Sequence, residues 1–217
     1  MFAMTTIARS AAPLLRRLAS RAVAFRAGVA GLAAIEFALI LPVMATIVFG
    51  LSDGTTGVVV KRKMTLLSRS LADLTSRVPT MTTTEMANIF AASAAIMQPY
   101  PDGELQMLVT SVNVTKVGET AVGSVSWSCG MRVPEAPSSG MTPEFSAHNL
   151  VRRPPGSAVA VPAGYEESQS FLYVETLRPY IPVIGYVLTG PFYMRESTPW
   201  PVRNVSRVTG PPSCPAA

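Results

Sequence analysis

Charged residues are scarce in this chain of 217 residues: they make up 14% of it, whereas a typical soluble domain has about 25%. With 48% hydrophobic residues, this composition excludes a disordered acidic or basic protein. Acidic residues are absent from residues 1–31, and the other 13 basic and 13 acidic residues cancel. The net charge of +5 therefore comes from five arginines near the N-terminus: Arg9, Arg16, Arg17, Arg21 and Arg26. No basic face is indicated for the rest of the chain, and we expect no nucleic-acid partner.

Cysteine and histidine are almost absent as well. The two cysteines, Cys129 and Cys214, are too few for a disulfide scaffold and do not form a CxxC pair. The single histidine, His148, lies in a predicted loop without the spacing of a metal site or a catalytic triad. Phosphate-binding glycine loops and the GxGxxG, HExxH and GxSxG motifs do not occur. We therefore expect no enzymatic activity, no cofactor, no metal and no small-molecule substrate.

One long apolar run is present, over residues 32–51, and Glu36 is its only charged residue. A helix of this length rises about 30 Å, the thickness of the hydrocarbon core of a bilayer. Pro42 lies inside the run, and transmembrane helices tolerate proline. A secretory signal peptide is the competing interpretation. Its apolar core is about 7–15 residues and precedes a cleavage site of small residues; here the run is longer and residues 50–52 are a weak site. A transmembrane helix is favoured.

The orientation of this helix rests on several weak signals. Basic residues flank both ends, so the positive-inside rule alone does not decide; those after the span are Lys61, Arg62, Lys63 and Arg69. Residues 1–31, which we call the leader, contain no acidic residue, and both cysteines lie after the span. Both observations favour a cytoplasmic N-terminus. Outside the cytoplasm, we expect a disulfide between Cys129 and Cys214. By closing the loop between them, it would stabilise the folded state by about 4–5 kcal/mol. Two free thiols in a cytosolic domain are the alternative.

Glu36 is the most informative residue, because a carboxylate in the bilayer costs up to about 2.5–3.5 kcal/mol. Gly31 precedes it by five residues and Phe37 follows it. This pattern, a glycine followed by four residues, a glutamate and an aromatic residue, resembles the processing junction of type IV pilins and pseudopilins. That resemblance implies a prepilin peptidase that cuts after Gly31 and leaves a new amino group on Leu32. Glu36 could pair with it. A plain signal anchor, with Glu36 reaching the interface, is the alternative.

Further residues of the span narrow the resemblance. Glu36 and Phe37 near its start, Leu41 and Pro42 in its middle, and a Phe-Gly pair at 49–50 are similar to the TadE-like family. These are pseudopilin-like proteins of the tight-adherence (Flp) pilus system. The resemblance implies a single-pass protein of the bacterial inner membrane with a periplasmic head, which enters or primes an adhesive pilus. Its expected partners are the prepilin peptidase, other pilin or pseudopilin subunits and inner-membrane lipid. Phe37 and Pro42 would join Glu36 in helix packing.

An amphipathic stem is expected over residues 52–78. Apolar residues recur in it at spacings of three and four, as in a heptad seam: Val60, Met64, Leu67, Leu71, Leu74 and Val78. The simplest structure is one long helix from the span through the stem, with its weakest point at residues 51–57, which include two glycines. The seam would pack on other subunits or on this chain's own head, and the two arrangements are compatible.

The head is predicted over residues 79–217. A helix is expected at 83–97, where Thr82 and Glu85 have capping-box spacing. A hairpin follows, with strands at 105–116 and 121–129; alternation places Val125, Trp127 and Cys129 on one face. Residues 130–165 are predicted to be a loop, followed by strands at 168–177 and 186–196 and a proline-rich tail. The fold class is α+β and pilin-like: a transmembrane helix with a stem, a second helix and a small antiparallel sheet.

A second hypothesis assigns a different class of function. In it, the chain is an unprocessed, single-pass anchored periplasmic binding domain with a pocket under the 130–165 loop. An anchored enzyme ranks third, because no catalytic constellation appears in the sequence.

Overall fold

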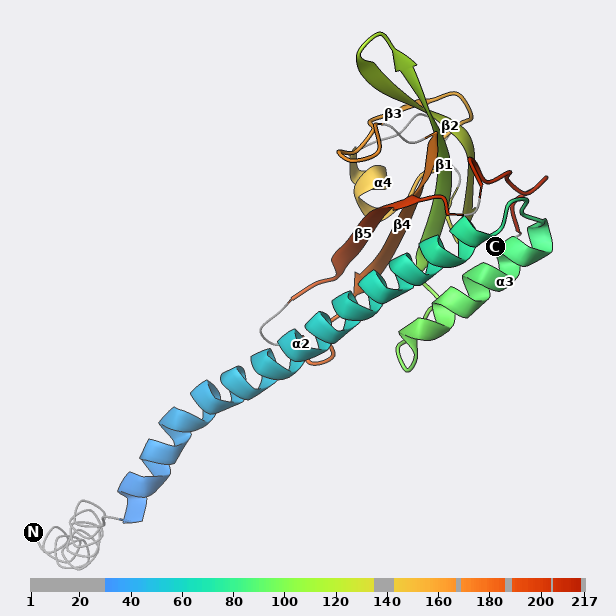
Figure 1. Ribbon diagram of the computed structural model, residues 1–217. Coiled ribbons are helices and arrows are strands. Elements are labelled where there is room, and N and C mark those ends of the chain that lie inside the picture. Colours follow the sequence, from blue (N-terminus) through green and yellow to red (C-terminus); the bar gives the residue numbers. More distant parts are fainter. Residues whose placement is uncertain (1–29, 135–142, 167–168, 186–188, 204, 216–217) are drawn as a thin grey trace, which may run out of the picture. The chain divides into compact units, whose positions relative to one another are not determined.

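The computed structural model describes residues 30–134, 143–166, 169–185, 189–203 and 205–215. They belong to two compact units, which divide after Leu51 and are described separately. The predicted leader lies outside the described residues, except for Ala30 and Gly31. Along the chain the elements are α2 (Ala30–Arg77), α3 (Thr83–Ala94), the short 3-10 helix η1 (Ala95–Met97), β1 (Gln106–Val117), β2 (Thr120–Met131), α4 (Pro143–His148), β3 (Ala158–Val159), β4 (Ser170–Tyr180) and β5 (Phe192–Pro201) (Figure 1).

Helix α2 is continuous for 48 residues. Residues 51–57, the expected weak point of the helix, are helical throughout. This corrects the expectation that their two glycines weaken the helix. Tertiary contacts explain the difference. Asp53 is 1% exposed, and the Tyr180 ring lies 3.5 Å from where a Cβ on Gly57 would stand. Packing of this kind overrides the low intrinsic helix propensity of glycine.

The heptad seam of α2 packs on the chain's own sheet. Val60, Met64, Leu67 and Leu71 are fully buried. They share one core cluster with α3 and with one face of the sheet, through residues that include Met86, Phe90, Met107, Val109, Leu172 and Val174. Of the two arrangements expected for the seam, the structure has the intramolecular one.

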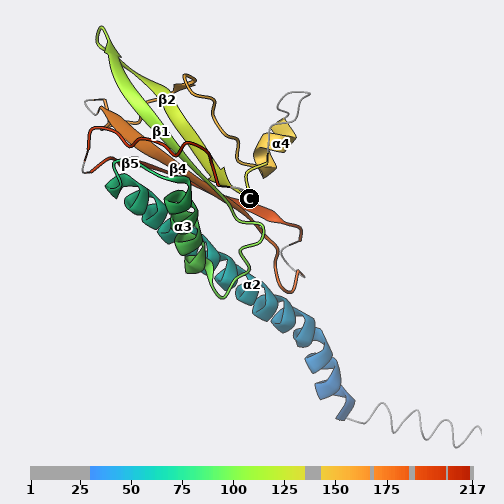
Figure 2. The same cartoon turned by 90° about the vertical axis from the view of Figure 1, so that its right-hand side faces the viewer.

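The five strands form one antiparallel sheet in the order β3-β2-β1-β4-β5. The predicted hairpin of β1 and β2 is confirmed, and Gly118 in its turn has a φ of 66°, which favours glycine. Helices α2 and α3 lie side by side on one face of the sheet, and α4 lies on the other (Figure 2). The sheet is thus covered on both faces, by helices on one and by the segment around α4 on the other.

A β-bulge in β2 changes which residues share a face. Ser111 pairs with Trp127, but the next residue, Val112, pairs with Val125, so Ser126 is the extra residue. Trp127 therefore joins the helix-side core, whereas Val125 points to the opposite face. The prediction that Val125 shares a face with Trp127 and Cys129 is wrong, because strict alternation fails across a bulge.

Two other expectations need correction. Residues 130–165 are not only a loop: they contain α4, which ends at His148, and the two-residue strand β3. The last strand runs over Phe192–Pro201 instead of 186–196. Prolines 199 and 201 obscured it in the sequence; β5 pairs only with β4, and an edge strand tolerates proline. Residues 186–188 of the predicted strand lie outside the described residues.

The N-terminus of α3 confirms the predicted capping box. The backbone N–H of Glu85 donates to the Thr82 hydroxyl (3.2 Å), and the Glu85 carboxylate accepts from the Thr82 backbone N–H (2.9 Å). Hydrogen bonds from the backbone and then the side chain of Thr82 lower the pKa of Glu85. The helix continues as η1 to Met97, so the predicted range of 83–97 agrees with the structure.

Candidate functional site

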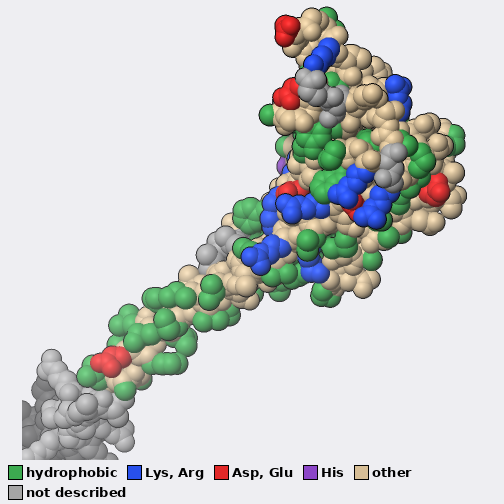
Figure 3. Space-filling model, viewed as in Figure 1, with side chains coloured by type: hydrophobic (Ala, Val, Ile, Leu, Met, Phe, Trp, Pro, Cys, Tyr) green, Lys and Arg blue, Asp and Glu red, His purple; other side chains and the backbone are tan. Residues whose placement is uncertain are grey.

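The apolar part of α2 is the first candidate site. Its large hydrophobic side chains are exposed, with Leu39 and Leu51 at 70%, and Figure 3 shows hydrophobic side chains along it. No polar face interrupts the run from 37 to 45. By length and composition, this is the one helix of the described chain that qualifies as a membrane span. A helix that is apolar all round needs an apolar environment, either lipid or other helices.

Glu36 is the exception within this segment. It is exposed in the helix, and residues 30–51 contain no lysine, arginine or histidine to pair with it. Leu32 lies one helical turn before it, so the two residues share a helix face. Phe37 is 64% exposed beside it. The carboxylate therefore has no cation within its own span.

Gly31 stands in the first turn of α2, which begins at Ala30. A Cβ at Gly31 would have no heavy atom within 4 Å, and its φ is not in the left-handed region. The described fold therefore does not require glycine at this position. Because Leu32 is also in the first turn, the predicted cleavage bond lies where a helix lacks part of its hydrogen bonding.

Pro42 is accommodated within the helix. Proline removes the backbone donor that would bond the carbonyl oxygen of Ala38. Separately, the Thr46 hydroxyl donates to the Pro42 carbonyl oxygen (2.7 Å), so this polar side chain of the apolar run is satisfied within the helix.

Asp53 organises the connection between β4 and β5. Its carboxylate accepts hydrogen bonds from the backbone N–H groups of Ile184 and Gly185 (both 3.2 Å). The Tyr180 hydroxyl donates to the Asp53 carbonyl oxygen (2.8 Å). Burial, and then the charge of Asp53, raise the pKa of Tyr180, so the phenol stays protonated and can donate. This role could not be predicted from the sequence, whose only local signal is an acidic residue shortly after the apolar run.

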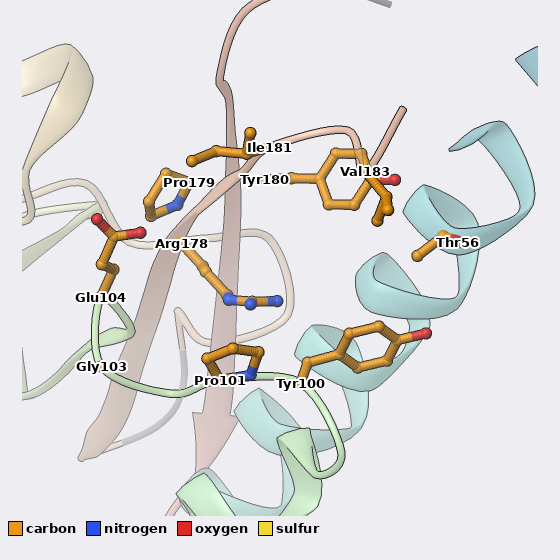
Figure 4. A pocket seen from close by; sticks show the side chains of 10 residues that line it. All are labelled: Thr56, Tyr100, Pro101, Gly103, Glu104, Arg178, Pro179, Tyr180, Ile181 and Val183. Atoms are coloured by element: carbon orange, nitrogen blue, oxygen red, sulfur yellow. The ribbon is translucent and has the colours of Figure 1, made fainter. Parts of the chain in front are cut away.

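A hollow of about 390 Å³ lies beside this connection (Figure 4). Its walls come from α2, from the segment before β1 and from the end of β4. Figure 4 shows the guanidinium of Arg178 pointing into it between the side chains of Tyr100 and Tyr180. Most of the other lining groups are apolar or aromatic.

The opposite face of the sheet has a buried ionic network. Glu175 is 4% exposed and pairs with Arg153 and with Arg195 (3.1 Å for the latter). Arg153 also lies over the ring of Tyr173, 5.3 Å from its centroid. A second hollow, of about 400 Å³, lies between Arg153, Tyr173 and residues 158–162. The binding-domain hypothesis expected a pocket in this region.

His148 lies against another aromatic side chain. Its ring centroid is 4.1 Å from that of Tyr193, and its side chain is half-buried. In the part of the chain that the structure describes, no three His, Cys, Asp or Glu residues are grouped so that they could hold a metal ion.

Cys129 and Cys214 form a disulfide, with Cα atoms 5.4 Å apart. It joins β2 to the C-terminal segment. The same segment is held by a hydrogen bond from the Trp127 indole N–H to the Val208 carbonyl oxygen (2.8 Å). Gly210 packs so closely on Trp127 that a Cβ there would stand 2.4 Å from the ring. The tail is thus fixed to the helix side of the sheet.

These elements follow one another in a recognisable order: a long apolar N-terminal helix, a second helix and a curled antiparallel sheet with a disulfide. The architecture is pilin-like. Comparison with protein-family models, with curated proteins and with solved structures finds no match to this chain. The pilin-like assignment therefore rests on the order and packing of the elements. The apolar helix identifies an anchor or a signal segment, and the disulfide fits a head outside the cytoplasm.

Proposed function

We propose that this protein is a pseudopilin-like, TadE-like structural component of a bacterial adhesive (Tad/Flp) pilus. It is inserted in the inner membrane by residues 32–51, with its head in the periplasm. A prepilin peptidase cuts after Gly31, and the processed chain packs laterally on other pilin or pseudopilin subunits. It carries out no chemistry itself. It either becomes part of the filament or primes its assembly.

The carboxylate of Glu36, which has no cation within residues 30–51, supports this proposal most strongly. An uncompensated charge in an apolar span is costly, and the span has no cation of its own. Cleavage after Gly31 creates an ammonium group on Leu32, about 6 Å along the helix axis from Glu36. Because every subunit then has one such ammonium and one carboxylate, neighbouring helices can satisfy each other. Glu36 would set the register of the packed helices.

The first test follows processing of the full chain in membranes with and without a prepilin peptidase. Intact mass should show that the peptidase removes residues 1–31 and that Gly31→Val blocks removal. Gly54→Val is the matched control, because Gly54 is another helical glycine with open space around it. A wild-type chain that keeps its leader beside an active peptidase would contradict the proposal.

The second test addresses packing. Glu36→Gln should be processed normally but lose oligomers captured by cross-linking in the membrane and lose pilus formation. Thr46→Val removes a polar group from the same span and should retain both. If Glu36→Gln forms oligomers and pili like the wild type, the assigned role of Glu36 is wrong.

The second hollow favours one alternative, an unprocessed anchored periplasmic binding domain. Its site would lie between Arg153, Tyr173 and residues 158–162. In that case Glu36→Ala leaves export and ligand binding unchanged, whereas Tyr173→Ala abolishes binding. To test this, a periplasmic extract is separated by size and each fraction is assayed for thermal stabilisation of the protein. A fraction that stabilises the wild type but not Tyr173→Ala would support this alternative.

A further inference from the structure

The guanidinium of Arg178 is an unusual group in its surroundings. Its Nη1 atom is buried and has no hydrogen-bond partner among the described residues. The guanidinium carbon lies over the ring of Tyr100, 5.9 Å from the centroid. Burial lowers the pKa of Arg178, and the charges of Glu104, Tyr100 and Asp102 raise it by less. Glu104 also lines the hollow, with its carboxylate turned away from this guanidinium in Figure 4. Neither carboxylate forms an ion pair with Arg178 within the described structure, so the hollow contains a cation without an ion-pair partner.

The rest of the hollow is suited to an amphipathic ligand. Pro101, Pro179, Ile181 and Val183 contribute apolar walls around the cation (Figure 4). Ile181 and Val183 are 65% and 83% exposed, so the rim itself is apolar. A single cation surrounded by apolar and aromatic groups favours an anionic group attached to a hydrocarbon body.

Chain connectivity places this hollow near the end of the span. Thr56 lines it and follows Leu51 by five residues. Even a fully extended chain would keep Thr56 within about 18 Å of Leu51, and five residues of helix rise only about 7.5 Å. The headgroup region on each side of the hydrocarbon core is about 5–8 Å thick. Chain connectivity therefore keeps a hollow that Thr56 lines within reach of the lipid phosphates.

The connection that forms the rim is also held near the end of the span. Asp53, two residues after Leu51, accepts hydrogen bonds from Ile184 and Gly185. These bonds keep the exposed Ile181 and Val183 side chains close to the residue that follows the span by two positions, and insertion among lipids would remove them from water. If this segment faced only solvent, holding exposed apolar side chains in place would bring no gain from burial.

We propose that this hollow binds the phosphodiester group of a membrane phospholipid, with Arg178 as its ion-pair partner and Ile181 and Val183 against the glycerol and upper acyl chains. The site is independent of cleavage and lateral packing. It rests on the proposed function only for the anchoring of residues 32–51 in the membrane.

The test uses the full chain in neutral detergent micelles, titrated with a short-chain phosphatidylglycerol and, in a second arm, with inorganic phosphate. Binding is measured by native mass spectrometry for the lipid and by NMR of the tyrosine and arginine side chains for both. Arg178→Gln should weaken lipid binding about tenfold or more, and Arg178→Lys should weaken it less, because it keeps a point charge. Arg62→Gln is the matched control: Arg62 is an exposed arginine on α2, and its loss should change the affinity less than about twofold.

Thr56→Leu fills the hollow from the helix side and leaves the guanidinium in place, so it should weaken lipid binding even if Arg178→Gln fails to fold. Equal binding by the wild type and both hollow variants would overturn the proposal, and so would an equal loss in Arg62→Gln. Inorganic phosphate bound as tightly as the lipid would show a simple anion site and overturn the assignment to lipid. Processing and oligomer assays do not enter this titration, so its failure is distinguishable from failure of the pilus proposal. A wild-type chain that does not enter micelles or membranes would contradict both.

Discussion

Asp53 shows how much one side chain can hold together in this molecule. The carboxylate lies in the interior of the Ser52–Ala217 unit and bonds two consecutive backbone N–H groups of the β4–β5 connection. Both N–H groups would lose a charged acceptor without it, and hydrogen bonds to a charged group are stronger than those between neutral groups. Asp53 thereby joins the helix to a segment more than a hundred residues away.

Replacing Asp53 by alanine should lower the free energy of unfolding by about 2–3 kcal/mol, since hydrogen bonds to a charged group are lost. Denaturant unfolding checks this, and limited proteolysis should cut within residues 181–191 earlier than in the wild type. Glu119→Ala is the control, because Glu119 is exposed in the β1–β2 turn; it should change stability by less than about 0.5 kcal/mol. A similarly small effect at Asp53 would contradict the assigned role.

Glu85 predicts a defined pH dependence. Its folded pKa lies below the ordinary value of 4.5, so its stabilising contribution is present above pH 4.5 and disappears as the pH falls through the folded pKa. Glu85→Gln keeps a capping group but does not titrate. The melting temperature of the wild type should exceed that of Glu85→Gln near neutral pH, and the two should converge in acid. A difference that stays constant below pH 4 would show that the cap charge does not matter.

At the scale of elements, two neighbouring leucines on α2 distinguish a side chain packed within the protein from one that is exposed. Leu67 is fully buried against the sheet, whereas Leu66 is 58% exposed. Leu67→Ala should lower the free energy of unfolding by about 2–5 kcal/mol, and Leu66→Ala should change it little. Denaturant unfolding of the two variants measures this difference directly. Equal effects would mean that the seam does not pack on its own sheet as described.

Much of the element order could be predicted because its signals are local. The apolar run, the three-four spacing from Val60 onward, the Thr82–Glu85 box and the hairpin turn at Gly118 each act over a few residues. Cys129 and Cys214 are the only cysteines, so their pairing needed just one further assumption, an oxidising compartment.

What could not be predicted depends on contacts distant in sequence. The extra residue at Ser126 is defined only by the partner strand, so alternation assigned Val125 to the wrong face. Strand β5 contains Pro199, which reads as loop until its position at the sheet edge is known. Likewise, the guanidinium of Arg178 lacks an ion-pair partner only because of the way that Tyr100 and α2 pack around it. The sequence contains no motif that predicts this.

At the scale of the whole molecule, the two units predict different solvent requirements. A fragment of residues 52–217 retains the buried seam, the sheet and the disulfide, so it should fold cooperatively without detergent. The full chain should stay in the membrane fraction after alkaline extraction because of residues 32–51. Circular dichroism melting of the fragment and fractionation of the full chain check this. A fragment that needs detergent would show that residues before 52 contribute to its fold.

The borders of the sheet restrict how copies of this protein can join. One border is β3, with only two residues, and the other is β5, which contains Pro199 and Pro201 and so lacks two backbone donors. The β5 border is therefore a poor template for the strand of another chain, and next to β3 the backbone of Val125 is already bonded to residues 156 and 157. Fibres of the cross-β or strand-exchange kind are disfavoured at these places. If copies of this protein associate as proposed, they would therefore do so through side-chain surfaces, without fusing their sheets.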